Sequence, residues 1–69
     1  MTHRLVVRCV QRTEDLRDSG VVLDPRPDEP QPEGQIRGFW LRMSRGDACQ
    51  FALGEFYEMV LTGPVEKPL

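Results

Sequence analysis

The residues best suited to chemistry in this 69-residue chain are one tryptophan and the arginines around it. Trp40 stands between Arg37 and Arg42, and Arg4 and Arg8 lie in an apolar segment near the N-terminus. An indole can stack on a nucleotide base while guanidinium groups bind its phosphate. These five residues are therefore the candidate binding site for an anionic, nucleotide-like ligand or for a host protein.

A second interpretation assigns the same residues a structural role. Trp40 would then lie in the core or in a subunit interface, and the arginines would pair with Glu55, Glu58 and the acids of a proline-rich loop. Cross-strand charge pairs of this kind contribute about 0.2–1 kcal/mol each. The sequence leaves both interpretations open.

Catalysis and metal binding need residues that this chain scarcely contains. His3 is its only histidine, which argues against histidine-based triads and zinc sites. Cys9 and Cys49 form no Cys-x-x-Cys motif and are interpreted as small, reduced, buried residues. The glycines are dispersed, so no phosphate-binding loop is predicted. We expect a non-enzymatic protein without metal or cofactor.

Charge is distributed in blocks along the chain, although the net charge is only −2. Residues 1–12 and 35–46 each carry three arginines and no acid, whereas residues 13–34 carry seven acids against two arginines. Binding of duplex nucleic acid normally needs a strongly basic domain. With a pI of about 5.2, this chain is not expected to bind a duplex.

The length predicts one small domain, residues 1–69, with a marginal core. No apolar run is long enough to cross a membrane, and the N-terminal residues lack the apolar stretch of a signal peptide. The expected location is therefore the cytoplasm of a host cell, or a virion.

Two strands are predicted in the first third of the chain. Residues 3–12 alternate with a period of two, which favours a strand with an apolar face of Leu5, Val7 and Cys9. Residues 21–23 form a second strand paired back on the first. The opposite face of the first strand would hold Arg4, Val6, Arg8, Val10 and Arg12.

The remaining segments are a proline-rich acidic loop over residues 24–34, a strand over 35–44 and a final strand over 55–62. Asp47 is predicted to cap one helical turn before the last strand. The alternative is a single helix over residues 47–61, with Gly54 inside it at a cost of about 1 kcal/mol.

These elements predict an all-β or mainly β fold, with four to five short strands and one helical turn. The antiparallel meander would either close into a small barrel or remain a curled sheet. Because an open sheet this small leaves edges unpaired, we expect a homo-oligomer.

Residues 41–64 resemble the C-terminal signature of a family of small phage and prophage β-proteins. Phe51, Gly54, Tyr57, Thr62 and Pro64 occupy comparable places in a turn-then-strand motif. The resemblance implies a viral origin and a non-enzymatic accessory protein. Two functions follow as hypotheses: a binding protein that uses the arginine and tryptophan surface, or a virion or assembly component held by edge-strand pairing.

Overall fold

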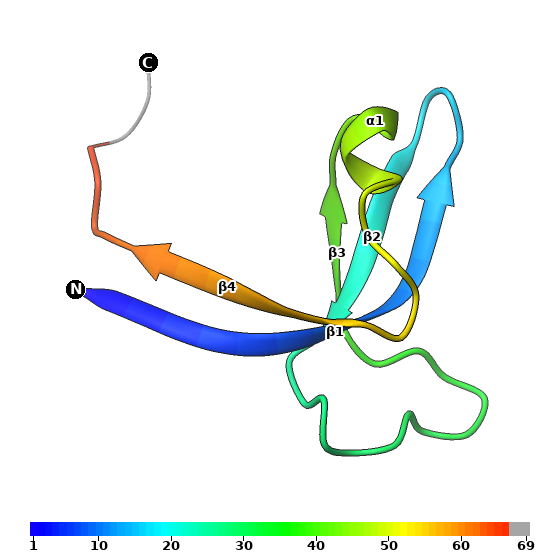
Figure 1. The fold of residues 1–69 in the computed structure, drawn as a ribbon, viewed down its shortest axis with the longest axis horizontal. Coiled ribbons are helices and arrows are strands. Elements are labelled where there is room, and N and C mark those ends of the chain that lie inside the picture. Colours follow the sequence, from blue (N-terminus) through cyan, green and yellow to red (C-terminus); the bar gives the residue numbers. More distant parts are fainter. Residues whose placement is uncertain (67–69) are drawn as a thin grey trace.

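Four antiparallel strands form one open sheet in the computed structural model, which describes residues 1–66 (Figure 1). The strand order is β3-β2-β1-β4, so the two outer strands do not pair with each other. The mainly β prediction is confirmed. The alternative helix over residues 47–61 is wrong, because the helix ends at Ala48 and a strand begins at Phe56. The elements are β1 (Thr2–Glu14), β2 (Ser19–Asp24), β3 (Phe39–Arg42), α1 (Arg45–Ala48) and β4 (Phe56–Thr62).

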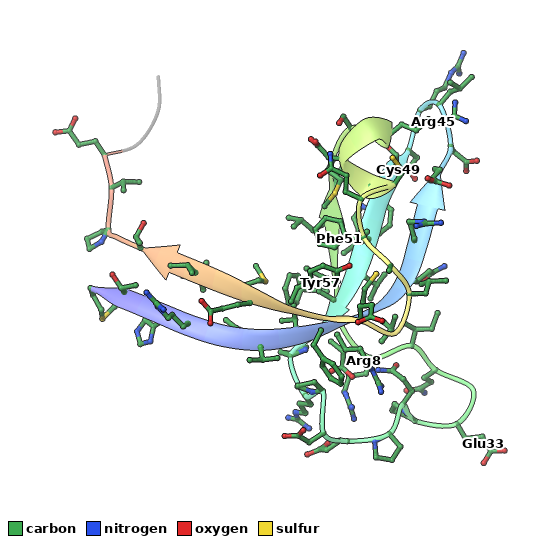
Figure 2. All side chains as sticks on the ribbon, viewed as in Figure 1. Arg8, Glu33, Arg45, Cys49, Phe51 and Tyr57 are labelled. Atoms are coloured by element: carbon green, nitrogen blue, oxygen red, sulfur yellow. The ribbon has the colours of Figure 1, made fainter. Side chains whose placement is uncertain are left out.

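The core lies on one face of the sheet, here called the core face. Val7, Cys9, Val21 and Leu23 are buried there, and burial raises the pKa of the Cys9 thiol. The helix α1 and the segment after it cover this face; Phe51 meets Tyr57 with ring centroids 4.9 Å apart (Figure 2). The predicted burial of Cys9 is confirmed.

The Cys49 prediction is wrong, because that cysteine is exposed at the end of α1. The predicted helix cap is also wrong. Ser44, not Asp47, precedes the helix, and its Oγ accepts a hydrogen bond from the Asp47 N–H at 3.1 Å. Both side chains are suitable caps by type, and the backbone places Ser44 three residues before that N–H.

An irregularity in β1 moves one arginine off its predicted face. Cys9 pairs with Leu23 but Gln11 pairs with Val22, so one extra residue lies between them. Arg12 then pairs with the buried Val21 and shares the core face, and it donates to the Phe51 carbonyl at 2.6 Å. A one-residue insertion reverses the faces of all later side chains, because strand side chains alternate.

The molecule has a body and an arm. The body contains β2, β3, α1 and residues 8–14 of β1. The arm is the two-stranded ribbon of β1 residues 2–7 with β4, and it projects away from the body (Figure 1). Val7 is buried in the core and Leu5 packs against it. The only described strand that pairs with residues 2–7 is β4, because the pairing of β1 with β2 begins at Arg8.

Candidate functional site

The five predicted site residues lie in three places. Trp40 and Arg42 are on β3, on the face opposite the core, here called the outer face. Arg4 and Arg8 are on the same face of β1, in the arm and at its base. Arg37 lies in the proline-rich loop, residues 25–38, rather than in the strand predicted over 35–44. The structure brings Arg8 and Arg37 together at the carboxylate of Asp24, but it does not gather all five residues into one cluster.

Trp40 covers the backbone of the neighbouring strand. A Cβ atom at Gly20 would lie 2.8 Å from Cζ2 of the indole, so only glycine leaves room for the ring at this distance. Trp40 nevertheless remains 42% exposed. Beside it, Arg42 Nη2 donates to the Arg17 carbonyl at 3.0 Å, which ties β3 to the β1–β2 turn. Trp40 thus presents one ring face to β2 and part of its surface to solvent.

Asp24 is the most densely bonded side chain of the outer face. It is fully buried, and Arg37 donates to both of its carboxylate oxygens, from Nε at 3.1 Å and from Nη2 at 3.0 Å. The Arg26 N–H and Gln31 Nε2 donate to the same carboxylate at 2.9 and 2.5 Å. Such a two-pronged pair with additional donors is the arrangement that stabilises a buried charge.

The charges around Asp24 are complementary. Hydrogen bonds from Arg37 lower the pKa of Asp24, against the opposing effect of burial, and hydrogen bonding to Asp24 raises the pKa of Arg37. Arg8 Nη2 lies 3.9 Å from the same carboxylate. Arg37 also donates to the side chain of Glu29 at 3.3 Å and to its carbonyl at 3.0 Å. Most of the Arg37 donors are therefore used within the chain.

The proline-rich loop is held in place by these contacts. Gln31 Oε1 accepts from the Arg37 N–H at 2.6 Å, and Gln31 Nε2 donates to the Arg37 carbonyl at 3.2 Å. Gln31, in the middle of the loop, is thereby fixed to Arg37 at its end, and both side chains also bond Asp24. Residues 25–38 form neither strand nor helix. The loop predicted over residues 24–34 begins one residue later, because Asp24 is the last residue of β2.

Three of the four candidate arginines pair with acids, as the structural interpretation of the sequence expected. Arg4 lies 3.7 Å from Glu58 across the arm, and Arg8 lies 3.9 Å from Asp24. Arg37 bonds both Asp24 and Glu29 of the loop. Asp24, the central partner, was predicted only as one of the acids of the proline-rich loop over residues 24–34. Its signal was only local: an acidic residue at the end of an apolar strand, followed by proline.

A shallow hollow adjoins this network. Its volume is about 390 Å³, and it is lined by Pro25, Arg26, Arg37, Gly38 and Phe39. Arg26 is exposed, with Nη1 3.8 Å from Glu29, so most of its donors face solvent. A guanidinium beside proline and phenylalanine can bind a small anion that carries an apolar group. The sequence analysis did not single out Arg26.

The arm has an unpaired edge on each side. The Cys9 N–H donates to the Glu55 carbonyl at 3.0 Å, and the Cys9 carbonyl accepts from Gly54 at 2.8 Å. Backbone groups alternate along an antiparallel strand, so those of Thr2, Arg4 and Val6 point away from β4. No described strand pairs with residues 2–7 on that side.

The second unpaired edge is β4 itself, the outermost strand of the sheet. Val7 pairs with Tyr57, so the alternate residues Phe56, Glu58 and Val60 direct their backbone groups outward. Apolar side chains stay exposed beside both edges: Val6 50%, Phe56 57% and Val60 50%. Exposed apolar strand edges are templates for pairing with another chain.

Among residues 1–66 there is no group of three or more His, Cys, Asp or Glu side chains placed to hold a metal ion. No helix in this part of the chain is long and apolar enough to span a membrane. Comparison of the chain with protein families, curated proteins and solved structures found no match.

Proposed function

We propose that this chain is a non-enzymatic binding protein whose body holds the arm out for pairing with another protein chain. One observation carries the proposal: β2 pairs with β1 only from Arg8 onward, so within residues 1–66 no strand pairs with residues 2–7 on the side away from β4. In a phage, as the sequence resemblance suggests, such a protein would serve as a virion or assembly component.

The arm has little of the usual protection of a strand edge. Natural edges are blunted by charged side chains, especially lysine, by proline, by bulges or by a covering loop. The arm has one charged pair on its outer face, Arg4 and Glu58, 3.7 Å apart. Residues 2–7 and 56–62 contain no proline, lysine or glycine, and the β1 bulge lies beyond the arm. A two-stranded ribbon is by itself marginal in water. A partner strand would stabilise the arm and cover its apolar side chains.

Hydrogen exchange tests this proposal residue by residue. The outward amides of Thr2, Arg4 and Val6 are compared with the inward amides of His3 and Leu5, in dilute protein and in the complex isolated from cells that make it. We expect the outward amides to exchange rapidly in dilute protein and to become protected in the complex. Outward amides that exchange rapidly in both samples would overturn the proposal.

The hollow beside Arg37 supports a second candidate function, the capture of a small anionic ligand. Its support is the exposed Arg26 guanidinium next to Pro25 and Phe39. Trp40 and Arg42 lie on the adjoining strand and would extend the surface toward a nucleotide-like ligand. This candidate differs from the first because it needs a side-chain surface rather than a strand edge.

Titration with adenosine monophosphate and with inorganic phosphate, followed by amide chemical shifts, tests the second candidate. Changes centred on Arg26 and Gly38 are expected with the nucleotide, and Arg26→Ala should abolish them. Arg45→Ala is the matched control, because Arg45 lies at the opposite end of the body (Figure 2). Unchanged shifts with both probes would exclude the hollow as an anion site.

A further inference from the structure

We infer that the partner of the arm is a second copy of this chain, bound head to tail, so that the β1 edge of one copy pairs with the β4 edge of the next. This inference rests on the proposed function and names its partner. The pairing is antiparallel and places Arg4 of one copy opposite Glu58 of the other. Both side chains lie on the outer face. The two strand edges that would form this contact, that of residues 2–7 and that of β4, have no strand neighbour among the described residues.

Charge selects this pairing over the two symmetric ones. Residues 1–12 carry three arginines and no acid, and β4 with the residue before it carries Glu55 and Glu58 without a cation. Pairing two β1 edges would bring arginines together, and pairing two β4 edges would bring glutamates together. Like charges directly opposite each other destabilise a sheet, whereas opposite charges stabilise it.

The register that faces Arg4 with Glu58 also matches the other outward residues. Val6 then lies opposite Phe56, and Thr2 opposite Val60, so the exposed valine and phenylalanine cover each other. This register ends at Val6, two residues before Arg8, where β2 occupies the edge of β1. The register used within the chain would instead place Phe56 opposite Arg8, at the position that Asp24 already fills.

The exposed surface is large enough for two such contacts in each copy. A folded monomer of this mass is expected to expose about 4,400 Å². This chain exposes 5587 Å², an excess of about 1,200 Å² relative to that expectation. Standard interfaces bury about 800 Å² on each partner. Two strand-edge contacts smaller than the standard size, one at each edge of the arm, would together cover an area comparable to this excess.

A head-to-tail contact uses different surfaces on the two copies, so it propagates. Such contacts close into a ring when the rotation between copies allows it and otherwise form an open filament. Each copy then contributes its arm to a shared sheet in which the order β1-β4 repeats. The bodies remain outside this sheet, attached through residues 8–14 of β1.

Edge-blocked variants of the full chain test the inference by native mass spectrometry and analytical ultracentrifugation. In Val6→Pro and in Val60→Pro the lost N–H points outward, so the ladder within the chain is kept. Wild type should assemble beyond a dimer, and each variant alone should be monomeric. An equimolar mixture of the two should form a capped dimer with one copy of each, because each variant retains the edge that the other lacks.

Other outcomes overturn the inference. Symmetric β1 pairing would leave Val60→Pro dimeric, and symmetric β4 pairing would leave Val6→Pro dimeric. A monomeric wild type, or variants that assemble as wild type does, would equally reject it. Circular dichroism of each variant checks that the fold is retained.

Charge variants give a second test that does not depend on proline. Arg4→Glu and Glu58→Arg should each fail to assemble alone, and their mixture should restore assembly with the two chains alternating. If the single variants and their mixture all assemble as wild type does, the Arg4–Glu58 register is wrong. A wild type that is monomeric alone, while its outward amides are protected in the complex isolated from cells, would reject self-pairing and keep the proposed function.

Discussion

Asp24 shows how one buried carboxylate can organise a loop of low intrinsic order. Its two oxygens receive hydrogen bonds from Arg26, Gln31 and Arg37, which lie at the start, middle and end of the proline-rich loop, respectively. A buried charge that loses its partners is costly. The loop is therefore expected to keep its shape only while Asp24 remains ionised.

Acid denaturation should reveal this dependence. The pKa of Asp24 is lower in the folded chain than its ordinary value of 3.8. Above that value, ionised Asp24 makes its full contribution to the free energy of unfolding. As the pH falls below it, the unfolded chain binds the proton first, so the free energy of unfolding decreases. Urea unfolding measured from neutral to acid pH should show that Asp24→Asn is less stable than wild type at neutral pH. Its free energy of unfolding should also decrease less in acid than that of wild type.

Asp28→Asn is the matched control, because Asp28 is exposed in the same loop. Its stability curve should follow that of wild type at every pH. Equal acid sensitivity of wild type and Asp24→Asn would show that Asp24 does not contribute to the pH dependence.

At the same scale, sequence analysis identified Arg37 as notable but not its partner. The two residues are thirteen positions apart and separated by four prolines, so no periodicity links them. The pairing depends on how β2 ends and how the loop returns to β3. That information exists only once the chain is folded.

At the scale of elements, alternation predicted where each strand lies, but the strand predicted over residues 35–44 is shortened to Phe39–Arg42. Phe39 and Leu41 alternate with Trp40 and Arg42 as expected, because side chains of a strand point to opposite faces. The bulge after Cys9 was not predictable from residue types, and it moved Arg12 to the core face. Bulges follow from the pairing of two particular strands, which a single-strand pattern does not contain.

The short helix gives a prediction at this scale. Ser44→Ala removes the acceptor for the Asp47 N–H and should lower the free energy of unfolding by about 1 kcal/mol. Asp47→Ala keeps that cap and loses only a favourable charge in the first turn, about 0.3–1 kcal/mol. Thermal unfolding of both variants measures the difference. A larger loss for Asp47→Ala would favour the cap predicted from the sequence.

At the scale of the whole molecule, the chain is more extended than its length requires. Its radius of gyration is 13.4 Å, whereas a compact domain of this length is expected to have about 11 Å. The arm contributes to the difference, since it projects away from the body (Figure 1). An extended shape with bare strand edges is what an assembling subunit presents.

Self-pairing predicts that stability depends on protein concentration. Each tenfold rise in the concentration of free partner above the dissociation constant adds about 1.4 kcal/mol to the free energy of unfolding of a bound copy. For a domain of this size that corresponds to a rise in Tm of about 6–11 °C. Differential scanning calorimetry over a dilution series should show the rise for wild type and not for Val6→Pro. A Tm that is independent of concentration in both would contradict assembly.

The sequence by itself determined the strands, the loop between the second and third of them, and the small core, because these follow from local alternation and from proline chemistry. Only the tertiary structure decided which arginines pair with acids and where the side chains of β1 change to the other face of the sheet. It also decided that the pairing of β2 with β1 ends at Arg8, so that no described strand pairs with the arm on that side. Those features depend on contacts between residues distant in the chain. Pairing and register are properties of two strands together, and a single strand does not encode them.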